Sequence, residues 1–246
     1  ARMIRLGLIG HPIGHSKSPA LHHGFMEESG TPGIYQCYER TTMDRKAMVE
    51  LFDQEGLTGI NITIPFKEQA LHWLDEVDEG AKSIGAINTI VKTGDRFVGY
   101  NTDVDGIAQT LDALGPEQPT LVLGGGGAAK ALCAVLEARQ TPYLMVQRHG
   151  AVTYDSLTEE QASAHPRWVN CTPVGGPKYP GDYLPLPYKV MTKEFAIFDM
   201  TYEPNPTPMM LKGKEMGAAV IGGNLMLTEQ AKTAWQLFHA AYYKNL

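Results

Sequence analysis

Polar side chains follow the ends of apolar segments in the first half of the chain. Ser16 and Ser18 come after "IRLGLIG", and Asn61, Thr63 and Lys67 belong to "GINITIPFK". Hydroxyl, amide and ammonium groups hydrogen-bond to hydroxyls and carboxylates, whereas an apolar ligand would leave them unpaired. These residue types therefore predict a site for a small, polyhydroxylated anion.

More polar residues of the same kind lie further along the chain. "GAINTIV" contributes Asn88, and "GYNTDVDG" contributes Asn101, Thr102 and Asp103. Ligands of open parallel sheets bind at the carboxyl ends of the strands, so residues at successive strand ends are expected to share one site. Each residue alone has a more ordinary interpretation, such as Ser18 or Asp103 capping a helix.

Lys67 stands where the apolar alternation of "GINITIP" gives way to a helical pattern. Reduction of a carbonyl needs a proton delivered to its oxygen, and oxidation of a hydroxyl needs the reverse, so a positioned lysine could carry that proton. A nearby carboxylate such as Asp103 would favour the charged ammonium, whereas burial and a helix N-terminus would oppose it. A solvated lysine at a helix start is the alternative.

A glycine-rich loop lies in "LVLGGGGAAKAL", where Gly124, Gly126 and Ala129 have the G-x-G-x-x-A spacing between an apolar strand and a helix. This context is typical of dinucleotide binding, because the glycines let the backbone approach a pyrophosphate at the helix N-terminus. A P-loop is excluded because Lys130 has no glycine before it and no serine or threonine after it. A glycine-rich turn without a ligand is the alternative.

The next strand, "PYLMVQRHG", ends in Arg148 and carries no acidic residue. An NAD site usually has an Asp or Glu here for the ribose, whereas a guanidinium can pair with the 2′-phosphate of NADP. The strand end therefore favours NADP, with an exposed charge of no special role as the alternative.

Strand and helix patterns alternate along the chain, which predicts an α/β fold with two domains. Residues 1–103 are expected to form a βα substrate domain with a mostly parallel sheet, including a helix over 67–78 and a hairpin over 87–101. Residues 104–224 are expected to form a Rossmann-like dinucleotide-binding domain. A last helix over 225–246 has no strand after it and is expected to pack back on the first domain.

Composition excludes several classes of protein. The 246 residues carry a net charge of −6 without a basic cluster, which argues against nucleic-acid binding. No apolar run is long enough to cross a membrane. The three cysteines lack a C-x-x-C spacing, no histidine spacing matches a metal site, and there is no G-x-S-x-G hydrolase motif. A cytoplasmic protein is expected.

Taken in order, the motifs resemble the shikimate dehydrogenase family over nearly the whole chain. They are "GHPIGHSKSPALHH", "GINITIPFK", "GAINTI", "GYNTDVDG", "LGGGGAAKA", "VNCTPVG", "FDMTYEPNPTP" and "GGNLMLTEQA". The resemblance implies a reversible, NADP-linked reduction of 3-dehydroshikimate to shikimate, a step of chorismate and aromatic amino acid biosynthesis. It also implies a small-molecule substrate, NADP as the cofactor, and no metal.

The resemblance assigns roles to individual residues. Lys67 and Asp103 would be the catalytic pair, and Ser16 and Ser18 would bind the substrate carboxylate. The other substrate-binding residues would be Asn61, Thr63, Asn88, Tyr202 and Gln230. The cofactor would lie against Gly124, Gly126, Gly127, Ala128 and Arg148, with Met200 and Gly223 beside the nicotinamide.

The chain departs from the family in the cofactor region. "Gln147-Arg148-His149" replaces the usual "NRT", a second arginine is missing, and the short segment 149–170 predicts a reduced or lost helix.

Three other interpretations of the function stay open. They are a quinate/shikimate dehydrogenase using NAD or NADP, a binding protein without catalysis, and a scaffold for protein partners. The residues do not distinguish a monomer from a homodimer.

Overall fold

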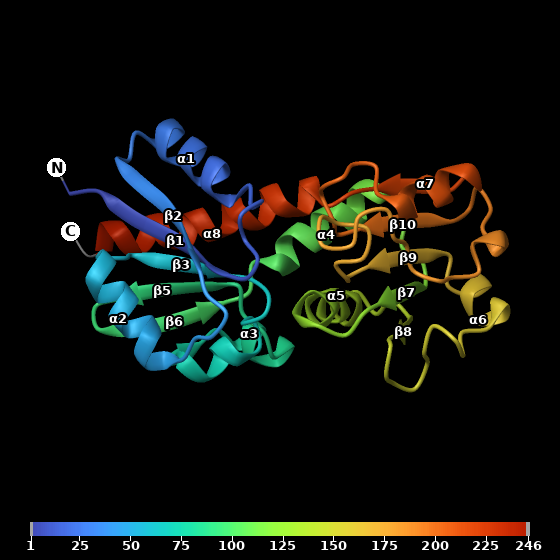
Figure 1. The fold of residues 1–246 in the computed structure, drawn as a ribbon, viewed down its shortest axis with the longest axis horizontal. Helices are drawn as coiled ribbons and strands as arrows, with labels where there is room; N and C mark the ends of the chain where they lie inside the picture. The colour runs from blue at the N-terminus through green and yellow to red at the C-terminus, as the bar shows by residue number, and fades with distance from the viewer. Residues whose placement is uncertain (1, 245–246) are drawn as a thin grey trace. The chain divides into compact units, whose positions relative to one another are not determined.

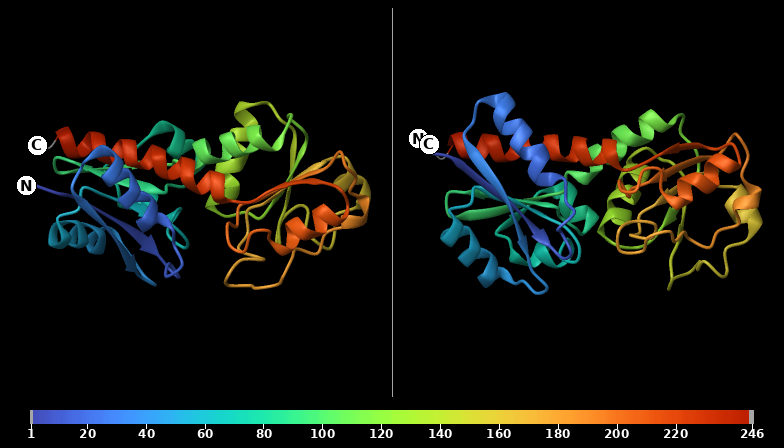
Figure 2. Two further views of the ribbon diagram at one scale, coloured as in Figure 1. Left: turned by 90° about the horizontal axis from the view of Figure 1, so that it is seen from above. Right: turned by 45° about the horizontal axis from the view of Figure 1, so that its top comes forward.

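The chain folds into two compact units in the computed structural model, which describes residues 2–244 (Figures 1 and 2). Of the described residues, 2–103 and 230–244 form the first unit, and 104–229 form the second unit. The last helix, α8 (Asn224–Lys244), begins in the second unit and ends in the first.

A six-stranded mixed sheet forms the centre of the first unit, in the order β2-β1-β3-β5-β6-β4. Its strands are β1 (Ile4–Gly10), β2 (Gly33–Glu39), β3 (Gly59–Ile62), β4 (Glu76–Val77), β5 (Thr89–Thr93) and β6 (Arg96–Tyr100). β1 pairs in parallel with β2 and β3, and β4 pairs in parallel with β6. β5 runs antiparallel to β3 and β6, which confirms the predicted hairpin.

Helices cover both faces of this sheet. Apolar side chains of α1 (Ser18–Ser29) and α8 pack with β1 on one face. On the other face, α2 (Arg45–Glu55), a short 3₁₀-helix η1 (Gln69–Trp73) and α3 (Glu79–Ile84) share a second apolar cluster with β3 and β5. Figure 1 shows α1 and α2 on opposite sides of the sheet.

The prediction of a helix over 67–78 was wrong. After η1 the chain becomes extended, because Asp75 exchanges hydrogen bonds with β6: its N–H donates to the Phe97 carbonyl at 3.0 Å, and its Oδ2 accepts from Phe97 N at 2.8 Å. Pairing with the sheet therefore overrides the local helical pattern. The interpretation of Ser18 as a helix cap was also wrong, since the capping position is Lys17 and Ser18 lies in the first turn.

The second unit contains a sheet of five parallel strands in the order β11-β10-β9-β7-β8. These strands are β7 (Thr120–Leu123), β8 (Tyr143–Val146), β9 (Arg167–Asn170), β10 (Ala196–Asp199) and β11 (Ala219–Ile221). The connecting helices are α4 (Asp103–Leu114), α5 (Gly127–Ala138), α6 (Glu159–Ser163), α7 (Pro208–Glu215) and the 3₁₀-helix η2 (Tyr188–Val190). The strand order reverses between β7 and β9, which is where nucleotides bind in doubly wound folds. The five-residue α6 confirms the predicted reduction of the helix before β9.

Among the described residues, none of the helices has the length and apolar character needed to cross a membrane.

Candidate active site

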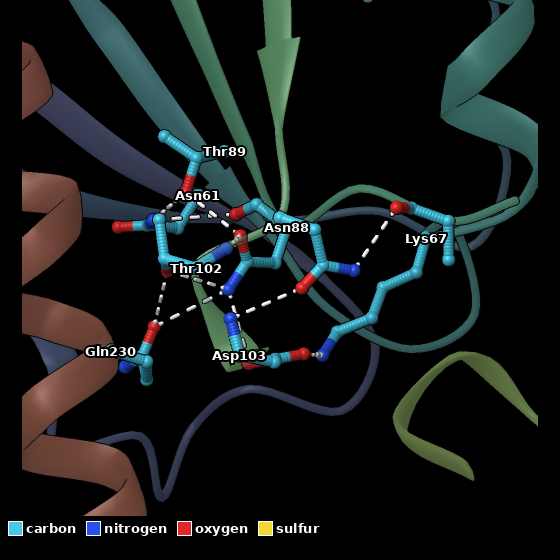
Figure 3. A network of polar contacts seen from close by, with 9 residues as sticks. Asn61, Lys67, Asn88, Thr89, Thr102, Asp103 and Gln230 are labelled. Atoms are coloured by element: carbon cyan, nitrogen blue, oxygen red, sulfur yellow. Dashed lines mark hydrogen bonds and ion pairs between the residues drawn. The ribbon is translucent and has the colours of Figure 1, made fainter. Parts of the chain in front are cut away.

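Lys67 and Asp103 form a close ion pair in the first unit (Figure 3). Lys67 follows β3 in the turn before η1, and Asp103 begins α4. The Lys67 Nζ lies 2.6 Å from Asp103 Oδ2, and the two side chains are 16% and 5% exposed. The backbone of Lys67 is also held, because its carbonyl accepts from Ile87 N at 2.9 Å. The two residues that the sequence named as a proton-transfer pair are thus in direct contact.

Asn88 lies at the centre of the hydrogen bonds around this pair (Figure 3). Its Nδ2 donates to Asp103 Oδ1 at 3.0 Å and to Thr102 Oγ1 at 2.9 Å. Its Oδ1 accepts from Thr102 N at 2.8 Å and from Thr89 Oγ1 at 3.0 Å. One oxygen of the carboxylate therefore binds Lys67 and the other binds Asn88, so the carboxyl group has a fixed orientation.

Gln230 and Asn61 extend the network on either side of Asn88 (Figure 3). Gln230 comes from α8, and its Oε1 lies 3.5 Å from Asn88 Nδ2 and 3.4 Å from Thr102 Oγ1. Asn61 comes from β3 and joins the network through its Nδ2, which donates to the Asn88 carbonyl at 3.3 Å and to Thr89 Oγ1 at 3.1 Å. Segments of the first unit that are far apart in the sequence thus contribute polar groups to one place.

The surroundings of the Lys67–Asp103 pair hold the lysine in place and leave its ammonium able to donate a proton. Asp103 is buried, and separating a buried carboxylate from its cation strongly destabilises the folded protein. The contact with Asp103 therefore holds the Lys67 side chain in place. An ammonium has three N–H donors, and the structure assigns one of them to Asp103. Because the Lys67 side chain is partly exposed, its ammonium can also donate a proton to a bound oxygen.

The two serines lie after β1 in the same unit. Ser18 is buried and Ser16 is half-buried, and Ser16 Oγ accepts from Ser18 N at 3.2 Å. Thr63 is half-buried after β3, and its backbone N–H donates to the Ile9 carbonyl at 2.9 Å. The segments after β1 and β3 therefore carry hydroxyls at one edge of the sheet, as the sequence predicts.

Sequence reasoning missed Tyr35 and assigned no role to His22. The Tyr35 hydroxyl donates to Asn61 Oδ1 at 2.8 Å, and its ring stacks on His22 with centroids 4.5 Å apart. Burial and, to a smaller extent, the neighbouring His23 lower the pKa of His22 from 6.5 to about 3, and a hydrogen bond with Asn61 opposes this shift. Tyr35 sits in an ordinary strand pattern, so no sequence signal marks it.

The glycine loop of the second unit is tightly packed. Gly126 is the capping residue of α5, which begins at Gly127. Gly124 has a φ of +113°, a conformation that favours glycine. A Cβ on Gly125 would lie 2.5 Å from Gln147 Oε1. A Cβ on Gly126 would have no described atom within 4 Å, so the backbone at the start of α5 is open to a pyrophosphate there.

The other expected cofactor residues lie at the same edge of the second sheet. Arg148 follows β8 and is exposed. Met200 follows β10, and its carbonyl would be only 2.1 Å from a Cβ on Gly223, so the two backbones touch. Tyr202 is half-buried in the same loop, in the second unit. Among residues 2–244, no three His, Cys, Asp or Glu side chains are grouped to hold a metal ion.

Comparison with known proteins agrees with this arrangement. Residues 8–90 match the family described as the shikimate dehydrogenase substrate binding domain. The shikimate dehydrogenase (NADP(+)) of Bacillus subtilis (strain 168) is 32% identical over 255 residues, covering 94% of this chain and 90% of the relative. The corresponding enzyme of Exiguobacterium sp. (strain ATCC BAA-1283 / AT1b) is also 32% identical, covering 95% of this chain and 92% of the relative.

Solved structures extend the likeness to the whole fold. The shikimate 5-dehydrogenase from Thermus thermophilus, in complex with NADP(H) and shikimate, has a TM-score of 0.83 at 30% identity, covering 98% of this chain and 100% of that chain. The quinate dehydrogenase from Corynebacterium glutamicum in complex with NAD has a TM-score of 0.85 at 26% identity, covering 97% and 94%. With identity of this extent along almost the full length, the chain belongs to the shikimate dehydrogenase family.

Proposed function

We propose that this protein catalyses the reversible, NADP-linked reduction of 3-dehydroshikimate to shikimate, a step towards chorismate and the aromatic amino acids. The observation that carries the proposal is the ion pair of Lys67 and Asp103 inside a network of amides and hydroxyls. A binding protein without catalysis has no use for a proton carrier held by a buried carboxylate. A protein scaffold leaves the whole network unexplained.

In this proposal the first unit supplies most of the residues that bind the substrate, and the second unit supplies Tyr202 and the residues that bind the dinucleotide. Ser16 and Ser18 hold the substrate carboxylate, and Asn61, Thr63, Asn88, Tyr202 and Gln230 bind its hydroxyls and carbonyl. The Lys67 ammonium gives a proton to the carbonyl oxygen during reduction and takes it back during oxidation. Asp103 Oδ2 holds that ammonium in place, and Asn88 Nδ2 donates to the other carboxylate oxygen and so fixes the orientation of the carboxylate.

The residues of the glycine loop fit a dinucleotide, because no described atom lies within 4 Å of a Cβ on Gly126, which leaves the backbone at the N-terminus of α5 open to a phosphate. Gly124, Gly126, Gly127 and Ala128 would hold the pyrophosphate, and Arg148 would pair with the 2′-phosphate. Met200 and Gly223 would lie beside the nicotinamide. The bound nicotinamide supplies the hydride for reduction and accepts it in oxidation.

A second candidate is a quinate/shikimate dehydrogenase that uses NAD or NADP. It is favoured by the "Gln147-Arg148-His149" segment, which carries one arginine, and by the likeness to a quinate dehydrogenase that binds NAD.

We propose that the enzyme works in the cytoplasm as a monomer or homodimer, without nucleic acid. The net charge of −6 supports the absence of nucleic acid, and the exposed, free Cys37 supports a reducing cytoplasm.

The test measures reduced nicotinamide by absorbance for shikimate or quinate, each with NADP⁺ or NAD⁺. We expect shikimate with NADP⁺ to have the highest kcat/KM of the four pairs. Higher kcat/KM with quinate would replace the proposal by the second candidate, and no reduction with any pair would refute both.

Replacement of Lys67 by Met leaves an unbranched side chain that is one atom shorter and has no ammonium group. We expect kcat to fall by roughly 10²–10⁴-fold, while the KM for shikimate changes by less than about tenfold. Lys46→Met is a matched control, because Lys46 lies on α2 and is 84% exposed. An unchanged kcat with a raised KM would make Lys67 a binding residue instead.

A further inference from the structure

A buried carboxylate at the end of β10 takes no part in the chemistry proposed above. Asp199 is 0% exposed, and each of its two oxygens is hydrogen-bonded. Oδ1 accepts from Asn170 Nδ2 and from Thr201 N, both at 3.0 Å, and Oδ2 accepts from Thr207 Oγ1 at 2.7 Å. Three donors thus converge on one side chain in the second unit.

These donors are an amide, a backbone N–H and a hydroxyl, so the charge of Asp199 is met by neutral groups. Burial raises the pKa of the Asp199 carboxyl, and the hydrogen bonds from Thr207, Thr201 and Asn170 oppose the shift. A buried charge with neutral partners is costly for stability. Fold stability alone therefore does not account for the carboxylate at this position.

The hydrogen bonds of Asp199 hold both ends of the segment 200–207. At its start, Thr201 N bonds to Asp199, and the Met200 N–H donates to the Asn170 carbonyl at 3.0 Å. At its end, Thr207 is the capping residue of α7, and its Oγ1 accepts from Met210 N at 3.2 Å while donating to Asp199. The segment is thus tied to the strand ends and to the helix by one carboxylate.

Asn170 fixes the other side of the same carboxylate. Its Oδ1 accepts from Thr172 N at 2.9 Å and from Thr172 Oγ1 at 2.7 Å, and its Nδ2 also donates to the Val174 carbonyl at 3.1 Å. The amide orientation is therefore determined, with Nδ2 directed at Asp199. The Thr201 carbonyl in turn accepts from Gly223 N at 3.0 Å, which links the segment 200–207 to the residues after β11.

We propose that Asp199 is a positioning residue of the reaction: by anchoring Thr201 and Thr207 it sets the position of the Met200 backbone and the Tyr202 side chain within the second unit. This inference rests on the proposed function, which assigns Met200 to the nicotinamide and Tyr202 to the substrate. Asp199 itself touches neither ligand. Loss of one anchor is expected to act more on hydride transfer than on binding, because transfer needs the reacting atoms aligned at about 3–3.5 Å, and a misplacement of about 1 Å can slow the reaction by about 10²-fold.

The test compares variants that change one anchor at a time. Asp199→Asn keeps the shape and removes the charge. Thr207→Val keeps the shape and removes the hydroxyl, and Thr207→Ser keeps the hydroxyl and serves as the matched control. We expect kcat to fall by roughly tenfold to hundredfold in the first two and to stay within about twofold in the third. The KM for shikimate should change by a smaller factor than kcat, because Tyr202 is only one of the residues proposed to bind the substrate.

Two further readouts separate positioning from a general loss of structure. The deuterium isotope effect with shikimate labelled at the oxidised carbon should rise in Asp199→Asn and Thr207→Val, because transfer becomes slower. Amide hydrogen exchange should become faster in the segment 200–207 and stay unchanged in the segment 120–138, which contains β7 and α5. Thr207→Ser should match the unchanged protein in both.

Wild-type kcat and isotope effect in both Asp199→Asn and Thr207→Val would overturn the inference, as would an equal loss in Thr207→Ser. Unchanged exchange in the segment 200–207 would overturn it independently of activity. If the wild-type protein reduced neither NADP⁺ nor NAD⁺, the proposed function would be refuted. Amide hydrogen exchange would still decide whether Asp199 anchors the segment 200–207.

Discussion

Mild acid is expected to destabilise the first unit through His22. This side chain of α1 is 1% exposed and lies among the rings of Phe25, Tyr35 and Phe238. Burial lowers its pKa from 6.5 to about 3, so the folded protein keeps it neutral where the unfolded chain protonates it. The unfolded state therefore binds more protons between those two values, and stability falls as the pH is lowered from about 6.5.

The magnitude follows from the size of the shift. One pKa unit corresponds to about 1.4 kcal/mol. Lowering the pH from neutral to about 5 therefore reduces the free energy of unfolding by about 2 kcal/mol through His22. By about pH 4 the loss reaches about 3 kcal/mol, and below about pH 3 it stops growing. Domains have roughly 5–15 kcal/mol of stability, so the change is large enough to measure.

The assay is urea unfolding at about pH 7.5 and about pH 5, followed by tryptophan fluorescence. A Trp168→Phe background leaves Trp73 and Trp235, which both belong to the first unit. Phe fits at 168 because the buried Trp168 Nε1 has no hydrogen-bond partner in the described structure. The variant His22→Gln is compared with His72→Gln, a control at an exposed histidine on η1.

Each protein is compared with itself at the two pH values, so the constant cost of a substitution cancels. In the background and in His72→Gln, the drop in stability should include the contribution of about 2 kcal/mol from His22. In His22→Gln the drop should be smaller by that amount. An equal drop in all three proteins, with equal denaturant slopes, would refute the reasoning.

Packing and cofactor contacts lead to further predictions. A Cβ on Gly59 would lie 2.4 Å from the Phe238 ring, so Gly59→Ala should cost about 1–3 kcal/mol in urea unfolding. Gly24→Ala, in α1 with nothing within 4 Å of its Cβ, should instead add about 0.5–1 kcal/mol; equal stabilities would contradict the packing. Arg148→Ala should raise the KM for NADP⁺ by roughly tenfold or more and leave that for NAD⁺ nearly unchanged, whereas equal effects would exclude a 2′-phosphate contact.

The polar network of the first unit was largely predictable. Strand ends can be located from apolar alternation, and neighbouring strands bring their ends to one edge of a sheet. That reasoning brings Lys67, Asn88 and Asp103 together, and the structure confirms their contacts. The glycine loop was predictable for a similar reason, since its spacing and its place between strand and helix are local features.

The remaining features depend on contacts between distant segments. Asp75 pairs with β6 instead of continuing a helix, and a local pattern carries no information about that partner. Tyr35 enters the network because β2 lies beside β1 in the sheet and points its ring at Asn61. Asp199 likewise acquires its three donors only when β9, β10 and the start of α7 come together.

The position of α8 determines the order in which the two units can be completed during synthesis. Gln230 contributes to the network around Asn88, and Phe238 packs in the core beside Gly59, yet both residues leave the ribosome after the whole of the second unit. The second unit is continuous in sequence and can fold as it emerges. A nascent chain paused before residue 230 therefore exposes an unfinished apolar surface on the first unit, which is where a chaperone would bind it.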